Sequence, residues 1–342
     1  MADKGKSAKD PTHYWVDQVD PELMNDIIRD FPDTTIDSKE KHESTHEVLC
    51  RPGPMLEGVE SEEIPRIGKM YFPKEEEDST KTVATSAAVL YIHGGGRIMG
   101  TYASGANNKI CSRIAKLLNV PVLSAKYRLA PEHPFPAALD DLLAAYKWLV
   151  DSIQKKAPSI TKENIRVGVS GESAGGGLAA ELCQLLLDDH NNANADSCPL
   201  PVAQLLIYPM LDDRTSVGSD KSIIPHLLWS HTSNVYAWSA YLRPNHQPGQ
   251  DQLPKYASAA RRTNMEGLPP TWIAVGDLDV FRTECQDYAT RMKDAGVPTK
   301  YLEVKGAYHG FVSFGSGEEP PVQQHWQSFQ DFALPYLNPF RT

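Results

Sequence analysis

The stretch IRVGVSGESAGGGLAAELCQLLL, residues 165–187, decides the fold of this 342-residue chain. It begins with the apolar run 165–170, which is typical of a buried strand, and a helical pattern extends from residue 174 to about residue 188. Between them stands a G-x-S-x-G motif, whose glycines leave room for a sharp, strained turn that lifts the Ser173 hydroxyl clear of a sheet. The helix start adds backbone N–H groups and a positive dipole end, which stabilise a negative oxygen. Ser173 is therefore a candidate nucleophile, although the bare motif also occurs as an ordinary turn before a helix.

Short apolar runs alternate with amphipathic helices on both sides of this stretch. That alternation is typical of an α/β fold, in which helices cover both faces of a mostly parallel sheet. The expected strands are residues 87–92, 120–127, 202–209, 271–276 and 299–306, and the expected helices are residues 107–118, 137–152, 281–294 and 321–337.

Two segments fall outside this alternation. Asp20 followed by Pro21 is a helix-start signal, and apolar residues on one face predict a helix that reaches about residue 31. Residues 210–262 are helical in pattern and rich in Trp and Tyr. We expect this second segment to be an insertion over the end of the sheet.

A glycine run, His93-Gly94-Gly95-Gly96, directly follows the expected strand 87–92. Glycines allow backbone amides to approach a tetrahedral oxyanion without interference from a Cβ atom. The alternatives are a flexible loop or a phosphate-binding loop, but the chain has neither the P-loop pattern nor a G-x-G-x-x-G at this site. Together with the G-x-S-x-G motif, the run indicates an oxyanion hole beside a nucleophilic serine.

These motifs resemble those of the hormone-sensitive-lipase-like esterases, family IV of the bacterial lipolytic enzymes. The resemblance covers roughly residues 80–335, and the matching passages are YRLAPE (127–132), HPFPAA (133–138), GESAGG (171–176) and YHGF (308–311). It implies the α/β-hydrolase fold, a small-molecule ester substrate of short to medium acyl length, no cofactor and a homodimer. It also implies a helical cap, which we assign to an N-terminal segment (1–55) and to the insertion at 210–262, on a core of residues 56–342.

A triad completes the expected site, because a serine needs a base that an acid holds in place. His309 follows the expected strand 299–306 in a glycine-flanked loop, and α/β hydrolases place the histidine last in the chain. For the acid, the resemblance points to Asp279, which begins a D-V-F-R-T-E passage similar to the family's D-P-L-R-D-E. Asp277 is the alternative and would otherwise cap or brace the loop.

The resemblance also implies the oxyanion hole and the substrate pocket. The oxyanion would be held by the N–H groups of Gly95, Gly96 and Ala174, with Gly94 as a substitute for one of them. The expected pocket walls are Trp15, Leu23, Ile27, Leu228, Trp229 and Trp238.

Three positions depart from the family pattern: Glu172 replaces an aspartate, Val280 a proline and Arg97 an aromatic residue. Arg97 directly follows the oxyanion glycines, so two outcomes are open. Its side chain turns outward to a carboxylate of this acidic chain, or it binds a carboxylate or other polar group of the substrate.

Composition narrows the classes of partner. The chain has 34 Lys and Arg against 44 Asp and Glu, a net charge of −10, so it has no basic surplus with which to neutralise a nucleic acid. No apolar run approaches the ~18 residues of a membrane span, and the first residues lack the apolar stretch of a signal peptide. Five scattered cysteines suit reduced thiols. We expect a soluble cytoplasmic protein.

His42-Glu43-Ser44-Thr45-His46 matches the H-E-x-x-H pattern of zinc proteases. That chemistry requires a helix on which both histidines share a face. Here the surrounding sequence shows no apolar helical stripe and is followed by a strand-like EVLC, residues 47–50. We therefore expect a polar loop and no metal site.

The sequence predicts a serine carboxylesterase. A lactone, amide or thioester hydrolase would use the same triad, and these substrates stay open as alternatives. A non-catalytic receptor is the alternative from another class, since the plant gibberellin receptors resemble the same esterases but have lost the catalytic histidine. This chain keeps Ser173, Asp279 and His309, which favours the enzyme.

Overall fold

A single mixed sheet forms the centre of the computed structural model, which describes residues 18–24, 35–74, 86–192, 198–215, 228–315 and 317–338. The strand order is β1-β2-β4-β3-β5-β6-β7-β8, parallel from β4 to β8, with β1 and β2 antiparallel at one edge. The strands are β1 (Val59–Ile64), β2 (Gly68–Pro73), β3 (Ala87–Ile92), β4 (Val122–Ala125), β5 (Arg166–Glu172), β6 (Ala203–Ile207), β7 (Thr271–Gly276) and β8 (Thr299–Val304). The expected α/β fold class is confirmed.

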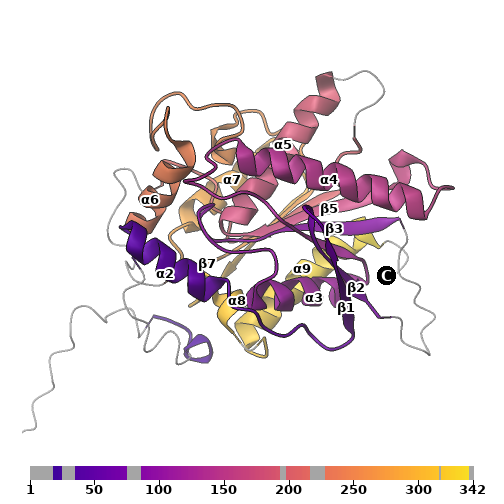
Figure 1. Ribbon diagram of the computed structural model, residues 1–342, viewed down its shortest axis with the longest axis horizontal. Helices are drawn as coiled ribbons and strands as arrows, with labels where there is room; N and C mark the ends of the chain where they lie inside the picture. The colour runs from indigo at the N-terminus through magenta and orange to yellow at the C-terminus, as the bar shows by residue number, and fades with distance from the viewer. Residues whose placement is uncertain are drawn as a thin grey trace, which may run out of the picture.

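Helices cover both faces of the sheet, with α4, α5 and α7 on one side and α3 and α9 on the other (Figure 1). Burial on both faces explains why the central strands read as unbroken apolar runs: every residue of β3 is buried. The helices are α2 (Lys39–Leu49), α3 (Gly105–Leu118), α4 (Ala137–Lys156), α5 (Ala174–Asn192), α6 (His231–Leu242), α7 (Arg282–Asp294), α8 (Phe311–Phe314) and α9 (Pro320–Leu337), with 3-10 turns η2 (Pro21–Leu23), η3 (Lys162–Asn164) and η4 (Ala259–Arg261).

The parallel strands bring the motifs to one edge of the sheet. β3 and β5 are neighbours, with Ile92 opposite Gly171 in the register. Since the carboxyl ends of parallel strands meet at the same edge, the loop after β3 and the turn after β5 lie side by side. The loops after β7 and β8 reach that edge as well.

The H-E-x-x-H residues lie in a helix, so the prediction of a polar loop followed by a strand was wrong. α2 begins after Ser38, whose side chain accepts a hydrogen bond from the Lys41 N–H at 3.3 Å. The helix rests on the loop that follows the glycine run: His42 Nε2 donates to the carbonyl of Ile98 at 2.7 Å. The weakly apolar sequence of α2 gives the helix little stability by itself, and these contacts with a distant part of the chain stabilise it.

The helices α2 and α6 lie next to each other (Figure 1). The Ile36 N–H donates to Ser233 Oγ at 2.8 Å, and the rings of His42 and Tyr236 are 6.2 Å apart. The helix predicted from Asp20 begins only as the 3-10 turn η2, with the Asp20 side chain accepting from Glu22 N–H, and the turn ends at Leu23 because the backbone of Met24 is extended. The predicted continuation through Met24 was therefore wrong. The rest of that predicted helix, residues 25–31, lies outside the described residues.

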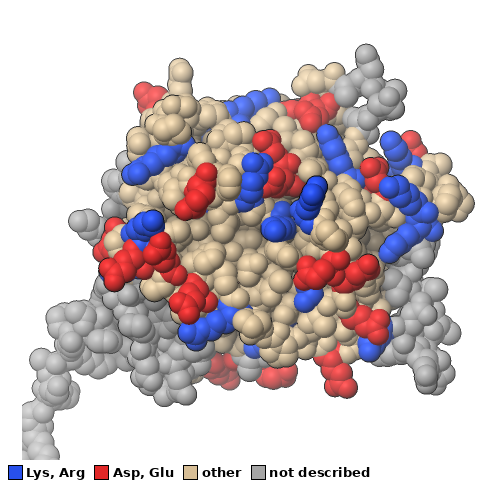
Figure 2. Space-filling view, viewed as in Figure 1, with Lys and Arg blue, Asp and Glu red and all other residues tan. Residues whose placement is uncertain are grey.

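The surface mixes charges of both signs. On the face in Figure 2, Lys and Arg side chains lie among Asp and Glu side chains, so the acidic surplus is not gathered in one patch on this side. Within the described ranges, no helix has both the length and the apolar character needed to cross a bilayer.

Candidate active site

Ser173 occupies a strained turn between β5 and α5. Its φ of 52° lies in the left-handed region, which is unusual for a residue with a side chain. The Ser173 N–H still donates to Ile207 O at 2.8 Å, so the end of the neighbouring strand fixes the turn. A Cβ on Gly171 would lie 2.3 Å from the Gly175 carbonyl oxygen, and one on Gly175 would lie 2.1 Å from that of Ile92. Both positions of the motif therefore require glycine.

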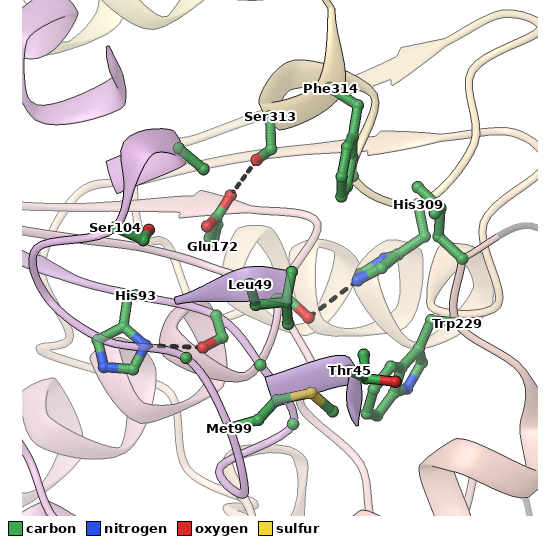
Figure 3. A pocket seen from close by; sticks show the side chains of 18 of the residues that line it. Thr45, Leu49, His93, Met99, Ser104, Glu172, Trp229, His309, Ser313 and Phe314 are labelled. Carbon is green, nitrogen blue, oxygen red and sulfur yellow. Dashed lines mark hydrogen bonds between the residues drawn. The ribbon is translucent and has the colours of Figure 1, made fainter. Parts of the chain in front are cut away.

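A continuous chain of hydrogen bonds joins Ser173, His309 and Asp279. Ser173 Oγ lies 2.9 Å from Nε2 of His309, the contact marked by the dashed line at His309 in Figure 3. On the other side of the ring, Nδ1 of His309 lies 2.8 Å from Oδ2 of Asp279. With Nδ1–H donating to the carboxylate, Nε2 is free to accept the serine proton. All three side chains are buried, with relative exposures of 7%, 7% and 1%. The structure thus brings together the three residues that the sequence predicts as the triad.

The two candidate acids after β7 have different partners. Asp279 is fixed by its own loop, because its Oδ1 accepts the N–H of Phe281 at 2.9 Å. Asp277 accepts the N–H of Gly306 at 2.7 Å and pairs with the exposed Lys305. Asp277 therefore braces the loops after β7 and β8, while Asp279 contacts the imidazole.

Aromatic rings surround the His309 imidazole. The ring centroids of Tyr208, Phe281 and Trp229 lie 4.9, 5.1 and 6.4 Å from that of His309. These side chains restrict the movement of the imidazole and limit the access of water to it.

The glycine run passes directly beside Ser173. A Cβ on Gly94 would lie 3.2 Å from Cβ of Ser173. Gly95 and Gly96 have φ values of 107° and 62°, and a Cβ on Gly96 would lie 2.4 Å from the indole of Trp229. Among the described residues, no backbone carbonyl accepts from the amides of Gly95, Gly96 or Ala174.

His93 lines the cavity, and its ring fixes the start of the glycine run. Its Nδ1–H donates to Gly94 O at 2.8 Å, and its ring stacks on Tyr127 at 4.3 Å. Burial lowers the pKa of His93 to about 4, so it is neutral at pH 7.

A cavity of about 580 Å³ opens above Ser173, a size common for small-molecule sites. α2 supplies one wall, through Thr45, Val48 and Leu49 (Figure 3). The predicted walls Leu228 and Trp229 line the cavity. The other predicted walls do not: Leu23 and Trp238 are buried elsewhere, and Trp15 and Ile27 lie outside the described residues.

The α2 wall was missed because its sequence was interpreted as a loop. The available signal was Ser38 as N-cap followed by Glu40 in the first turn. Ser313 and Phe314, just after the Y-H-G-F passage, also line the cavity and were not predicted.

Glu172 places a carboxylate in the cavity wall beside the nucleophile (Figure 3). Its Oε2 accepts the hydroxyl groups of Tyr208 at 2.8 Å and Ser313 at 2.7 Å. The contact residues are neutral, so they do not compensate the charge.

Arg97 does not reach the cavity, so its predicted contact with substrate is corrected. The side chain is fully buried and forms an ion pair with Glu181 of α5, Nη2 to Oε1 at 2.8 Å. Its φ of 66° turns the side chain away from the cavity and into the core. The alternative, that the Arg97 side chain turns outward to a carboxylate, was wrong about the outward direction. It was right about the carboxylate, which is that of the buried Glu181.

The two histidines of the H-E-x-x-H motif are engaged by the protein. His42 donates to Ile98 O, while Nδ1 of His46 accepts the N–H of Gly100 and its Nε2 contacts the Cys50 sulfur at 3.3 Å. In the part of the chain that the structure describes, no group of three or more His, Cys, Asp or Glu side chains could hold a metal ion.

Comparison with known proteins agrees with this architecture. A sequence profile for the alpha/beta hydrolase fold matches residues 89–313. The chain is 31% identical over 282 residues to Lipase 2 of Moraxella sp. (strain TA144), covering 77% of this chain and 63% of that protein. It is 32% identical over 231 residues to carboxylic ester hydrolase LipN of Mycobacterium tuberculosis (strain ATCC 25618 / H37Rv), covering 67% of this chain and 58% of that protein. The chain thus spans less than two thirds of the length of these two relatives.

A solved structure of a bacterial heroin esterase superposes with a TM-score of 0.74 at 26% identity, over 92% of this chain and 98% of that one. The matched region contains both the glycine run and the serine turn. The chain therefore belongs to the α/β-hydrolase fold family, and within it to the hormone-sensitive-lipase-like esterases that its motifs indicate.

Proposed function

We propose that this protein is a serine carboxylesterase that hydrolyses small esters of short to medium acyl length. The observation that carries the proposal is the hydrogen-bonded chain from Ser173 through His309 to Asp279 at the floor of a largely apolar cavity. The names of the relatives, a lipase and a carboxylic ester hydrolase, support the same reaction.

In the first half of the proposed reaction, Ser173 Oγ attacks the ester carbonyl and its proton passes to Nε2 of His309. Asp279 keeps Nδ1–H in place and stabilises the imidazolium. The negative oxygen is held by the N–H groups of Gly95, Gly96 and Ala174. His309 then gives its proton to the leaving oxygen, the ester C–O bond breaks, and an acyl group remains on Ser173.

In the second half, water attacks the acyl carbonyl and gives its proton to His309. The tetrahedral intermediate collapses, the carboxylic acid leaves, and the proton returns to Ser173 Oγ. The apolar cavity wall suits an acyl chain, because transfer of each buried CH₂ group from water contributes about 0.8 kcal/mol.

The proposal includes a cap of two segments, residues 1–55 and 210–262, on a core of residues 56–342. Its support is that α2 and the pair Leu228 and Trp229 line the same cavity and that the Ile36 N–H donates to Ser233 Oγ.

The test is activity on a p-nitrophenyl acyl series, beside lactone, amide and thioester panels, with wild type and Ser173→Ala. We expect hydrolysis of the esters, a loss on the order of 10⁴–10⁶ in kcat for Ser173→Ala, and labelling of Ser173 by a fluorophosphonate. Retention of more than a tenth of the turnover by Ser173→Ala would refute the assignment of the nucleophile.

A further inference from the structure

The side chain of Arg97, the residue after the glycine run, contacts four parts of the molecule: α5, Met210, Ala257 and α6. Its guanidinium forms two hydrogen bonds with Glu181 of α5, Nη2 to Oε1 at 2.8 Å and Nη1 to Oε2 at 3.2 Å. It also donates to the carbonyls of Met210 at 3.3 Å and Ala257 at 3.4 Å. Both charged side chains have zero exposure. Such a forked pair fixes the orientation of both partners, since the planar guanidinium matches the carboxylate.

Two aromatic rings of α6 complete the guanidinium site. The guanidinium carbon of Arg97 lies 4.2 Å from the ring centroid of Trp238 and 4.4 Å from that of Tyr241. Cation–π contacts of this kind are stronger when they are desolvated. The α6 helix is thereby held to the same point as α5.

The backbone geometry couples this site to the proposed oxyanion hole. Arg97 follows Gly96, and both have left-handed φ values, 66° and 62°. The loop therefore turns sharply between the glycine run, which passes beside Ser173 at Gly94, and the Arg97 side chain, which lies in the core. On the far side, the Arg97 carbonyl accepts from Ala130 N–H at 3.0 Å.

The nucleophile helix is shaped to receive the guanidinium. Gly177 and Glu181 are spaced by four residues, so they lie on one face of α5, and the Gly177 N–H donates to the Ser173 carbonyl at 3.1 Å. A Cβ on Gly177 would lie 2.8 Å from Nη2 of Arg97. Met210 links Ser173 to the Arg97 guanidinium, because its N–H donates to Ser173 O at 2.9 Å while its carbonyl accepts from Arg97.

We propose that Arg97 is a positioning residue, which holds the amides of Gly95 and Gly96 in register with Ser173 through its buried pair with Glu181. The inference rests on the proposed function. Arg97 does not line the cavity, so it does not contact the substrate. It acts on the transition state through the oxyanion loop, and replacing it leaves the residues of the cavity wall in place.

The experiment replaces the pair by apolar side chains, in Arg97→Met/Glu181→Leu, so that no buried charge is left unpaired. Kinetics are measured on p-nitrophenyl butyrate together with the melting temperature. Since small displacements of catalytic groups cost on the order of 10²-fold in rate, we expect kcat to fall by roughly that factor while KM stays within about threefold. The Ki of a trifluoromethyl ketone, whose adduct oxygen needs the oxyanion hole, should rise in parallel.

Arg97→Lys supplies the same readout if the double variant fails to fold, because it keeps the buried charge paired. It lacks the fork, so we expect an intermediate fall in kcat at unchanged KM. The matched control is Arg262→Met/Asp188→Leu, which removes another forked ion pair, Nη1 to Oδ2 and Nη2 to Oδ1 both at 2.9 Å, near the C-terminal end of α5 and so at the other end of that helix from Ser173. The control should lower the melting temperature and leave kcat unchanged.

If the wild type is active and the Arg97 variants have the same kcat as the wild type, this inference is overturned and the proposed function is not. An equal loss of kcat in the control variant would have the same consequence. A rise in KM at unchanged kcat would do the same. A wild-type protein inactive on every ester would overturn the proposed function and this inference together.

Discussion

Nδ1 of His309 faces Oδ2 of Asp279 at 2.8 Å, although a second carboxylate, that of Asp277, stands only two residues earlier in the same loop. The choice between them follows from the chain geometry. Asp277 is turned toward the Gly306 amide, and Asp279 is held by the N–H of Phe281.

Replacing the two acids in turn should separate their roles. Asp279→Asn removes the charge that orients and stabilises the imidazolium, so we expect kcat to fall on the order of 10³–10⁴-fold. Asp277→Asn keeps an acceptor for Gly306 and loses only a pair with the exposed Lys305, so kcat should hardly change. The measurement is kcat of both variants on one ester. A larger loss in Asp277→Asn than in Asp279→Asn would assign the catalytic acid to Asp277.

The carboxylate of Glu172 should discriminate between acyl groups of different charge. At a separation of about 8 Å and an effective dielectric of about 20, repulsion of a second carboxylate amounts to about 2 kcal/mol, or roughly thirtyfold in rate. Glu172→Gln should therefore raise kcat/KM on a monosuccinate ester relative to the matching butyrate ester. The exposed Glu266→Gln serves as the control, and an unchanged ratio in Glu172→Gln would contradict the prediction.

Trp229 should limit the length of the acyl chain. It lines the cavity and lies against Gly96 and the His309 ring. Trp229→Ala opens space, so kcat/KM relative to the acetyl ester should rise by roughly fourfold for each further CH₂ that the enlarged cavity accepts. Trp229→Phe tests the same idea with a smaller loss of packing. Trp148→Phe, on α4, should leave the chain-length profile as it is.

His325 should make the folded protein sensitive to acid. It is fully buried among aromatic rings, neither ring nitrogen has a partner among the described residues, and burial lowers its pKa to about 3. The unfolded chain takes up this proton below about pH 6.5, whereas the folded protein stays neutral down to about pH 3. Stability is thus complete above pH 6.5 and decreases as the pH falls from 6.5 to 3, by about 2 kcal/mol between pH 7 and pH 5 from this group.

His325→Phe removes the proton site and fills the same apolar space. Urea unfolding from pH 7 to pH 5 should show a flatter stability profile in this variant than in wild type. The exposed His133→Gln should keep the wild-type slope. A His325→Phe profile parallel to wild type would assign the acid sensitivity to other groups.

The sheet and the triad could be predicted because their signals are local. An apolar run such as residues 87–92 requires burial on both faces wherever it lies, and the G-x-S-x-G motif needs glycines for contacts within a few residues or with the neighbouring strand. The order of the residues along the chain then leaves His309 and His325 after Asp279, and only His309 follows a strand in a loop. Each of these inferences depends on a short stretch of sequence.

The docking of α2 as a cavity wall and the direction of the Arg97 side chain could not be predicted, because both depend on distant partners. Residues 39–49 are mostly polar, and their helix docks through His42 on Ile98, 56 residues later. The Arg97 side chain is oriented by two left-handed residues and by Glu181, 84 residues away. A pattern of polarity contains no information about such pairs.

The position of α2 has a consequence for engineering this protein. The helix forms a wall of the cavity, yet it precedes residue 89, where the family match begins, and it contributes none of the reacting groups. Its hydrogen bonds to the rest of the protein include those of Ile36 with Ser233, His42 with Ile98, His46 with Gly100 and Arg51 with Gly105. Residues 35–51 thus form a cassette, and transplanting the corresponding segment of a relative would exchange the selectivity of the cavity while the hydrolytic machinery stayed in place.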